Sequence, residues 1–223
     1  MKRQPMKIVI AGGHGQIAQH IERLLVARGD EAVGLVRNPN HIADIESNGA
    51  TAVLLDLERA SLNELAEMLR GADAVVFAAG AGPGSGAARK LTVDRDAAIL
   101  LADAAVQTQV PRYVMISGKG ADKGGQGEAD EVFSIYLDAK KAADDDLMSR
   151  EMDWTIVRPG VLTNGVGTGR VTLASQVEWG EVSREDVAAV IISILDKPES
   201  AGWVVELVAG EMPITEAVRL LAR

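Results

Sequence analysis

The 223-residue sequence predicts an α/β protein with a doubly wound parallel sheet of about seven strands and helices on both faces. Three observations support this fold class. Strand-like and helix-like segments alternate along the chain without a break. A glycine-rich turn joins the first strand-like run to the first helix-like one. The run at residues 74–78 is continuously apolar, as expected of a strand that is buried on both faces.

The first unit, residues 7–18, combines a strand, a tight turn and the start of a helix. Its small residues are Gly12, Gly15 and Ala18, spaced three apart. Glycine permits the sharp turn and the close approach of a pyrophosphate, and alanine lets the helix pack near the strand. The free N–H groups of the helix would face the anion. A turn that binds nothing is the alternative, but the strand before it and the amphipathic helix after it favour a dinucleotide site, formed by Gly12, Gly13, His14, Gly15, Gln16 and Ile17.

The other elements follow in order along the chain. Period-2 and continuous apolar runs predict strands at residues 32–36, 50–55, 74–78, 113–116, 154–157 and 204–208. Helical spacing predicts helices at about 41–47, 62–70, 87–107, 132–147, 184–195 and 213–221. Ser61 with Glu64, and Ser183 with Asp186, have the spacing of capping boxes.

One segment, residues 161–180, has no helical period and is rich in glycine and threonine. We expect it to form a small substrate-side segment, which makes the substrate lobe minimal. Nothing else in the sequence divides the chain, so we predict one domain over residues 1–223.

Composition limits the class of partner. The net charge of −9 and the pI near 4.9 disfavour nucleic acid and anionic membranes, and favour a small-molecule substrate. The absence of cysteine excludes disulfides and thiolate metal sites, and the three scattered histidines give no reason to expect a metal. The apolar run after residues 1–5 is too short for a signal peptide or a membrane span, so we expect a cytoplasmic protein.

A second group of residues is suited to proton transfer. Tyr136 and Lys140 lie four apart on a predicted helix, hence on one face, and an ammonium beside a phenol lowers the pKa of the phenol. Ser117 ends a predicted strand, where its hydroxyl can hold a substrate oxygen. The alternative is that Lys140 pairs with Asp144 on a solvated helix face. The glycine-rich loop at residues 80–86 is expected to cover the site.

These motifs together resemble the short-chain dehydrogenase/reductase superfamily: Gly12-x-x-Gly15-x-x-Ala18, Ala78-Ala79-Gly80, Ser117, Tyr136-x-x-x-Lys140 and Arg158-Pro159-Gly160. The glycine spacing is that of the extended members, but the chain is much shorter. It therefore most resembles the atypical NAD(P)H-binding branch, which is epimerase/dehydratase-like and includes flavin reductase of the biliverdin-reductase type.

The resemblance implies a Rossmann-type sheet, a nicotinamide cofactor and a catalytic set of Ser117, Tyr136 and Lys140. It also implies cofactor contacts from Ala78, Ala79, Gly80, Ser117, Lys140 and Pro159. Many relatives carry an asparagine on the helix after strand four, and Asp94 takes its place here.

The cofactor is predicted to be NADP, with NAD as the alternative. The second strand ends at Arg37, whose guanidinium can hold a 2′-phosphate, whereas NAD-selective sites usually have an acidic residue there. Asp56 and Leu57, after the third strand, are expected beside the adenine. The predicted function is an NADP-dependent oxidoreductase acting on a small carbonyl, quinone or flavin-like substrate. The alternatives are a non-catalytic NAD(P)-binding redox sensor and, less favoured, a sugar-nucleotide epimerase or dehydratase.

Overall fold

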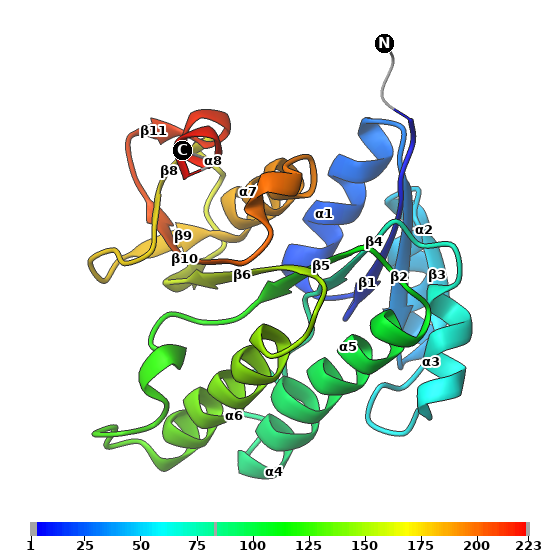
Figure 1. Cartoon of the computed structure of the whole chain (residues 1–223), viewed down its shortest axis with the longest axis horizontal. Helices are drawn as coiled ribbons and strands as arrows, with labels where there is room; N and C mark the ends of the chain where they lie inside the picture. Colours follow the sequence, from blue (N-terminus) through cyan, green and yellow to red (C-terminus); the bar gives the residue numbers. More distant parts are fainter. Residues whose placement is uncertain (1–3, 83, 222–223) are drawn as a thin grey trace.

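The computed structural model of the chain describes residues 4–82 and 84–221. Its centre is a nine-stranded sheet in the order β11-β8-β10-β6-β5-β4-β1-β2-β3 (Figure 1). Seven neighbouring strands are parallel, as predicted. They are β1 (Lys7–Ala11), β2 (Glu31–Val36), β3 (Thr51–Leu54), β4 (Ala74–Phe77), β5 (Arg112–Ile116), β6 (Asp153–Pro159) and β10 (Trp203–Ala209).

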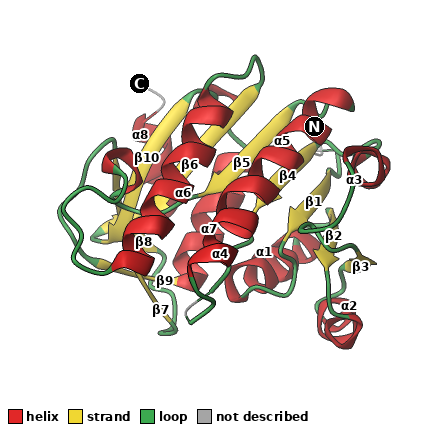
Figure 2. Ribbon diagram, turned by 90° about the horizontal axis from the view of Figure 1, so that it is seen from below, coloured by secondary structure: helices red, strands yellow, loops and turns green. Residues whose placement is uncertain are grey.

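Helices cover both faces of the sheet (Figures 1 and 2). Alternate residues of β1 show why: Ile8 and Ile10 belong to one fully buried core, and Val9 and Ala11 belong to the other. The first core lies under α1 (Gln16–Ala27), α2 (Ile42–Ser47), α7 (Arg184–Leu195) and α8 (Ile214–Leu221). The second lies under α3 (Leu62–Leu69), α5 (Ala97–Gln107) and α6 (Glu131–Met148). The doubly wound prediction is therefore confirmed.

The segment at residues 161–180 is more regular than expected. It contains β7 (Val161–Thr163) and β8 (Arg170–Ala174). β8 joins the main sheet, antiparallel to β10 and to β11 (Met212–Pro213), while β7 pairs only with β9 (Glu181–Ser183). Val171 and Leu173 point inward and alternate with exposed residues, a period-2 pattern too short to stand out among glycines and threonines.

The predicted helix at residues 87–107 has the expected span but not a uniform geometry. It consists of α4 (Ala87–Arg89), a π-helical segment η2 (Lys90–Asp96) and then α5. Short π segments are rare and occur often at functional sites. Pro83, in the preceding glycine-rich loop, lies outside the described residues, as do Lys2 and Arg3 near the N-terminus.

The capping predictions are confirmed at α3 and partly at α7. Ser61 and Glu64 form a reciprocal capping box. The Ser183 hydroxyl accepts from the Asp186 N–H at 2.9 Å, but the Asp186 carboxylate instead accepts from the N–H groups of Thr168 and Gly169. Asp186 thus fixes the turn that leads into β8.

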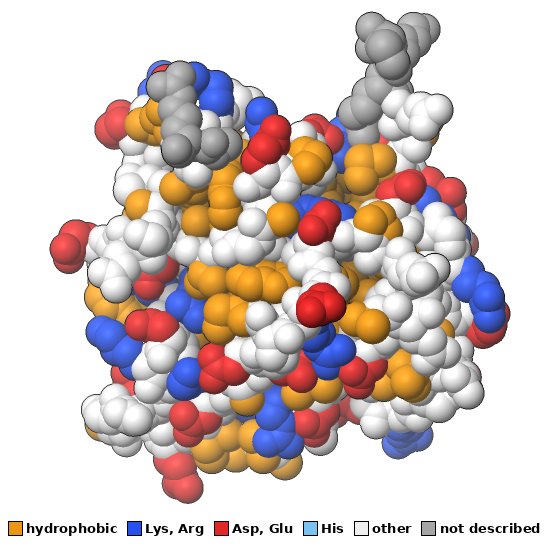
Figure 3. Space-filling view, viewed as in Figure 1, with side chains coloured by type: hydrophobic (Ala, Val, Ile, Leu, Met, Phe, Trp, Pro, Cys, Tyr) orange, Lys and Arg blue, Asp and Glu red, His pale blue; other side chains and the backbone are white. Residues whose placement is uncertain are grey.

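Surface charge is mixed on the face drawn in Figure 3, where Lys and Arg side chains alternate with Asp and Glu. No helix within residues 4–82 and 84–221 combines the length and the apolar character needed to cross a bilayer.

Candidate cofactor and substrate cleft

Two cavities meet at the glycine turn, above the carboxyl ends of β1 and β4. The larger has a volume of about 590 Å³ and the smaller about 300 Å³. Both are lined by the same four residues, Gly15, Ala78, Ala79 and Gly80, so they are two halves of one cleft. Strand order reverses between β1 and β4. Open α/β sheets bind their ligands at this kind of crevice.

The glycine turn is held by close backbone contacts. Gly12 has φ of +82°, and a Cβ there would lie 2.7 Å from Ala79 Cα, so only glycine fits. Gly13 lies against Gly34, where a Cβ would be 2.7 Å from Gly34 Cα, and it lines neither cavity. Gly15 has an extended backbone and lines both cavities, and a Cβ there would lie 3.1 Å from Gly12 O.

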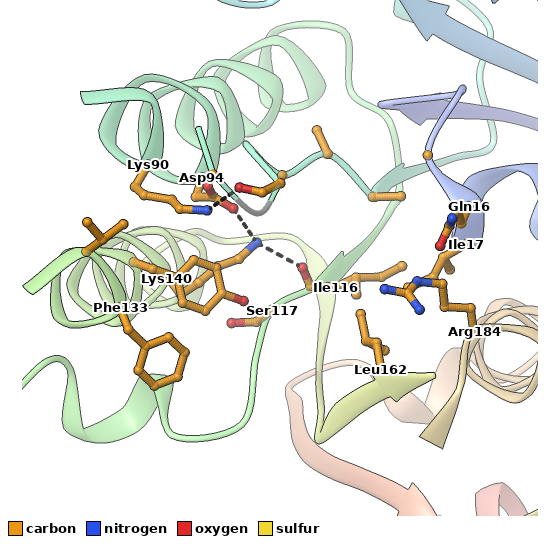
Figure 4. A pocket seen from close by; sticks show the side chains of 18 of the residues that line it. Gln16, Ile17, Lys90, Asp94, Ile116, Ser117, Phe133, Lys140, Leu162 and Arg184 are labelled. Carbon is orange, nitrogen blue, oxygen red and sulfur yellow. Dashed lines mark hydrogen bonds and ion pairs between the residues drawn. The ribbon is translucent and has the colours of Figure 1, made fainter. Parts of the chain in front are cut away.

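The first turn of α1 is suited to an anion. It contains no acidic residue and no side-chain cap, so its first N–H groups have no partner within the helix. Gln16 and Ile17 line the larger cavity from this turn (Figure 4). The helix dipole adds partial positive charge. The residues present therefore fit a pyrophosphate.

The smaller cavity has apolar walls and a charged mouth. Glu58 accepts from Arg37 at 3.0 Å, from Arg89 at 2.9 Å and from Thr92 at 2.6 Å. Burial alone would favour the protonated acid, but Arg89, Thr92 and Arg37 together hold the pKa of Glu58 below its ordinary value. Two guanidinium groups share the Glu58 carboxylate, and with Asp56 the cavity is lined by two arginines and two acids. The walls are Leu35, Val36, Leu55, Leu57, Val93 and Ala97.

Further polar groups lie at the same cavity. Asp56 lines it, although its Oδ1 also accepts from the Glu58 N–H at 3.1 Å. The His14 and His41 rings stack with centroids 3.5 Å apart, and His14 Nε2 lies 2.8 Å from the Asp44 carboxylate. Within the described residues, potential metal ligands do not gather in groups of three or more.

Ser117, Tyr136 and Lys140 all line the larger cavity. Lys140 Nζ lies 5.9 Å from the centre of the Tyr136 ring. Ser117 is buried at the end of β5, and its hydroxyl lies beside the Asp144 carboxylate, where it opposes the rise that burial gives to the pKa of Asp144. Gly118 makes room for the phenol, because a Cβ there would lie 2.7 Å from the Tyr136 oxygen. The sequence signal for this role of Gly118 is its position directly after Ser117.

Lys140 does not lie on a solvated helix face. It is 3% exposed, and its ammonium contacts Asp94 Oδ1 at 3.3 Å and Ile116 O at 3.3 Å. Burial favours the neutral amine, but Tyr136, Asp94 and Asp144 outweigh it and raise the pKa of Lys140. The alternative, a Lys140–Asp144 pair on a solvated helix face, is therefore wrong. Asp144 is buried and pairs with Arg158 at 2.9 Å.

The pKa of Tyr136 is raised rather than lowered, contrary to the expectation from sequence. Burial is the main cause, and it outweighs the opposing effect of Lys140. Asp94 and Asp144 contribute further to the rise. Spacing in the sequence shows that a lysine lies near the phenol but not how deeply the phenol is buried, and here burial decides the direction of the shift.

Other residues at the cavity were not predicted from sequence. Lys90, Phe133, Leu162 and Arg184 line it, and Pro159 does not. Figure 4 shows two ends: Lys90, Asp94, Lys140, Ser117 and Phe133 lie at one, and Gln16, Ile17, Leu162 and Arg184 at the other. Asp94 connects Lys140 to the glycine-rich loop after β4. Its Oδ1 contacts Lys140, and its Oδ2 accepts from the Ala81 N–H at 3.1 Å.

Comparisons with known proteins find a matching family and relatives along most of the chain. The sequence model of a family described as NAD(P)H-binding matches residues 12–198. A Bacillus subtilis protein named an uncharacterized sugar epimerase, YhfK, is 36% identical over 217 residues, which cover 97% of this chain and 100% of that protein.

Solved structures share the fold. A Bacillus halodurans protein named as an NAD-dependent epimerase/dehydratase has a TM-score of 0.88 and 32% identity, over 96% of this chain and 99% of that one. The oxidoreductase YlbE of Lactococcus lactis has a TM-score of 0.85 and 27% identity, over 97% and 96%. A Streptococcus pneumoniae protein named as an NADH-flavin reductase has a TM-score of 0.72 and 22% identity, over 92% and 100%, which shows the fold alone.

Proposed function

The chain belongs to the NAD(P)H-binding family, and from that premise we propose that it is an NADP-dependent oxidoreductase acting on a small carbonyl, quinone or flavin-like compound. One observation carries the proposal. Ser117, Tyr136 and Lys140 share a single cavity of about 590 Å³ with the anion-binding turn of α1. Proton-transfer groups and a cofactor site in one space are what a nicotinamide-dependent reductase requires.

The cofactor would lie along the whole cleft. The N–H groups of Gln16 and Ile17 would hold the pyrophosphate, and Asp56 and Leu57 would flank the adenine. The further cofactor contacts are assigned to Gly12, His14, Gly15, Ala78, Ala79, Gly80, Ser117 and Lys140, whereas Gly13 and Pro159 line neither cavity. When bound, a reduced nicotinamide supplies the hydride.

The charged mouth of the smaller cavity favours NADP over NAD. Arg37 and Arg89 both pair with Glu58, so two guanidinium groups lie at this mouth and can contact a 2′-phosphate. Arg37 has a half-exposed side chain and can turn toward such a group without leaving a buried charge behind.

The protein's own groups favour the reductive direction. With its raised pKa the Tyr136 phenol is protonated near neutrality, as a group that donates a proton to a substrate oxygen must be. The Ser117 hydroxyl, which lines the same cavity, can donate a hydrogen bond to the same oxygen. Lys140 keeps positive charge beside the phenol and stabilises the phenolate left after transfer.

A dinucleotide-binding sensor is the second candidate, and one observation favours it. Asp94 offsets the charge of Lys140, so the tyrosine receives less help than an unpaired lysine would give. A sensor would bind NADPH and pass no hydride to any acceptor.

Sugar-nucleotide epimerisation is less favoured by the shape of the molecule, although two of the relatives carry epimerase names. Of the segment at residues 161–180, β8 belongs to the main sheet, and only Leu162 lines the larger cavity. This leaves little structure to enclose a sugar nucleotide.

Turnover with a panel of acceptors separates these functions. NADPH consumption would be followed with aldehydes, quinones and FMN, for the wild type and for Tyr136→Phe. We expect Tyr136→Phe to keep its NADPH affinity and to lose about 10²- to 10⁴-fold in turnover, the usual contribution of a positioned proton donor. An equally fast variant would keep the reductase function and remove Tyr136 from it. Binding of NADPH without consumption by any acceptor would favour the sensor.

A further inference from the structure

Lys90 is a buried cation at the larger cavity that the proposed reaction does not use. It is 8% exposed and opens the π segment η2. Its ammonium donates to Gly82 O at 2.8 Å and lies 5.3 Å from the centre of the Tyr136 ring. An ammonium has three N–H donors, so one carbonyl satisfies only part of it.

The other buried cations of the described chain are compensated differently. Lys140 has Asp94, Lys119 has Glu206, and Arg158 has Asp144. Arg112 has no acid in ion-pair range but is closed in by three neutral acceptors from Asp153, Thr155 and Ser200. Lys90 has neither an acid within ion-pair distance among the described residues nor such an enclosure, and it faces a cavity.

The carboxylates that line the cavity are already engaged. Asp94 binds Lys140 with one oxygen and the Ala81 N–H with the other. Asp130 caps α6, accepting from the Phe133 N–H at 2.8 Å. A buried, unpaired ammonium is unfavourable unless an anion neutralises it, and no described side chain in this cavity is placed to do so.

The side chains around Lys90 indicate what kind of molecule would bring an anionic group to it. Phe133 and Tyr136 stack with ring centroids 5.8 Å apart, and Val132 extends the same apolar wall. Lys90 and Phe133 lie at the end of the cavity opposite Gln16 and Ile17 (Figure 4). A pyrophosphate on α1 would therefore leave this end for the substrate.

We propose that Lys90 is a specificity-determining residue that binds an oxyanion, carboxylate or phosphate, on a flat apolar substrate. The inference rests on the proposed function, because it assigns this end of the cavity to the substrate. The ammonium contacts the oxyanion, while the wall formed by Val132, Phe133 and Tyr136 packs on the apolar body.

A purely structural role for Lys90 is the alternative to be tested, since its bond to Gly82 O also restrains the loop before α4. Loss of a loop restraint would weaken charged and neutral ligands alike. Loss of an anion site would weaken charged ligands alone.

The test uses calorimetric titration of the full chain saturated with NADPH. The probes are 2-naphthoate, 2-naphthyl phosphate and the neutral 2-naphthamide. The variants are Lys90→Met, Lys90→Arg and the control Lys141→Met, which removes a lysine paired with Asp145 outside both cavities. NADPH affinity is measured first for each protein.

We expect Lys90→Met to bind at least one of the two anions about 10- to 100-fold more weakly, the usual effect of losing a charge-assisted hydrogen bond, with 2-naphthamide and NADPH affinities within about twofold of wild type. Lys90→Arg should restore most of the loss, and Lys141→Met should match wild type. The preferred anion identifies carboxylate or phosphate as the group recognised.

Equal weakening of charged and neutral probes, no change in Lys90→Met, or no binding of either anion to the wild-type complex would each overturn the inference. A protein that binds no NADPH would instead reject the proposed function. The two failures are therefore distinguishable.

Discussion

At the scale of a single residue, Glu22 is a buried acid beside the glycine turn. It lies on α1 with no exposed surface, and its Oε2 accepts from Asn48 at 2.8 Å. Its Oε1 has no partner in the described chain and lies against Gly34, where a Cβ would be 2.7 Å away. Burial raises the pKa of Glu22 to about 7, against smaller opposing effects of Asn48 and Arg23.

This raised pKa predicts a pH-dependent stability. Between about pH 4.5 and 7 the folded state keeps a proton that the unfolded state has lost, so the free energy of unfolding falls as the pH rises. Glu22→Gln cannot ionise, and we expect it to be more stable than wild type at pH 8 by about 1 to 3 kcal/mol, with a smaller difference at pH 5. Urea unfolding at both pH values measures this.

The control for that experiment is Glu46→Gln, on the exposed face of α2. It should differ little from wild type at either pH. A Glu22→Gln variant that is less stable than wild type at pH 8 would show that the ionised carboxylate is stabilised by its surroundings.

Sequence spacing could bring the site residues together but could not give their charge state. Tyr136 and Lys140 are four apart, which places them on one helix face. Their charge states depend on contacts with residues far away in the sequence. Asp94, more than 40 positions away, pairs with Lys140, and Arg158 pairs with Asp144. For the same reason the direction of the Tyr136 pKa shift could not be predicted. Lys90 carried no sequence signal, since a lysine at the start of a helix is usually solvated.

At the scale of elements, the cofactor end of the cleft depends on where three segments end. β2 ends next to Arg37, the turn after β3 supplies Glu58, and α4 supplies Arg89. Arg37 could be predicted because strand ends meet at one edge of a parallel sheet. Arg89 could not, because its place depends on the path of the loop before α4.

We expect Arg37→Ala to weaken NADPH binding about 10- to 100-fold and to change NADH binding by no more than about threefold, because only NADPH carries the 2′-phosphate. Arg70→Ala is the matched control: its side chain is 69% exposed, pairs with Glu67 and lines neither cavity. Fluorescence titration with both cofactors measures the affinities. Equal losses for NADPH and NADH would mean that Arg37 acts only by holding Glu58.

Element prediction was most accurate where a segment is long or buried on both faces. The seven parallel strands and the helices α1, α3, α5, α6 and α7 follow from apolar period and capping residues. β8 was missed because its two inward residues, Val171 and Leu173, are too few to set a period. The π segment could not be predicted because its seven residues, Lys90–Asp96, are too few to show a period different from that of an α-helix.

At the scale of the whole molecule, the strand order creates the cleft. β1 has β2 on one side and β4 on the other, and the chain leaves β1 and β4 in opposite directions. The opening between them receives the glycine turn, and both cavities share its rim. The proposed function therefore requires that one dinucleotide lies across Gly15 and occupies both cavities.

Gly15→Val gives the most direct measurement of that claim. The backbone at Gly15 is extended, at φ −62° and ψ 147°, so valine can adopt it, and its Cβ would lie 3.1 Å from Gly12 O at the rim that both cavities share. NADPH binding would be measured by fluorescence titration, with thermal unfolding of the same protein by circular dichroism as the check on folding. The account predicts saturable binding at one site in the wild type, and at least about 100-fold weaker binding in a Gly15→Val protein that unfolds near the wild-type temperature. NADPH that fails to bind the wild type, or that binds the folded variant equally well, would contradict it.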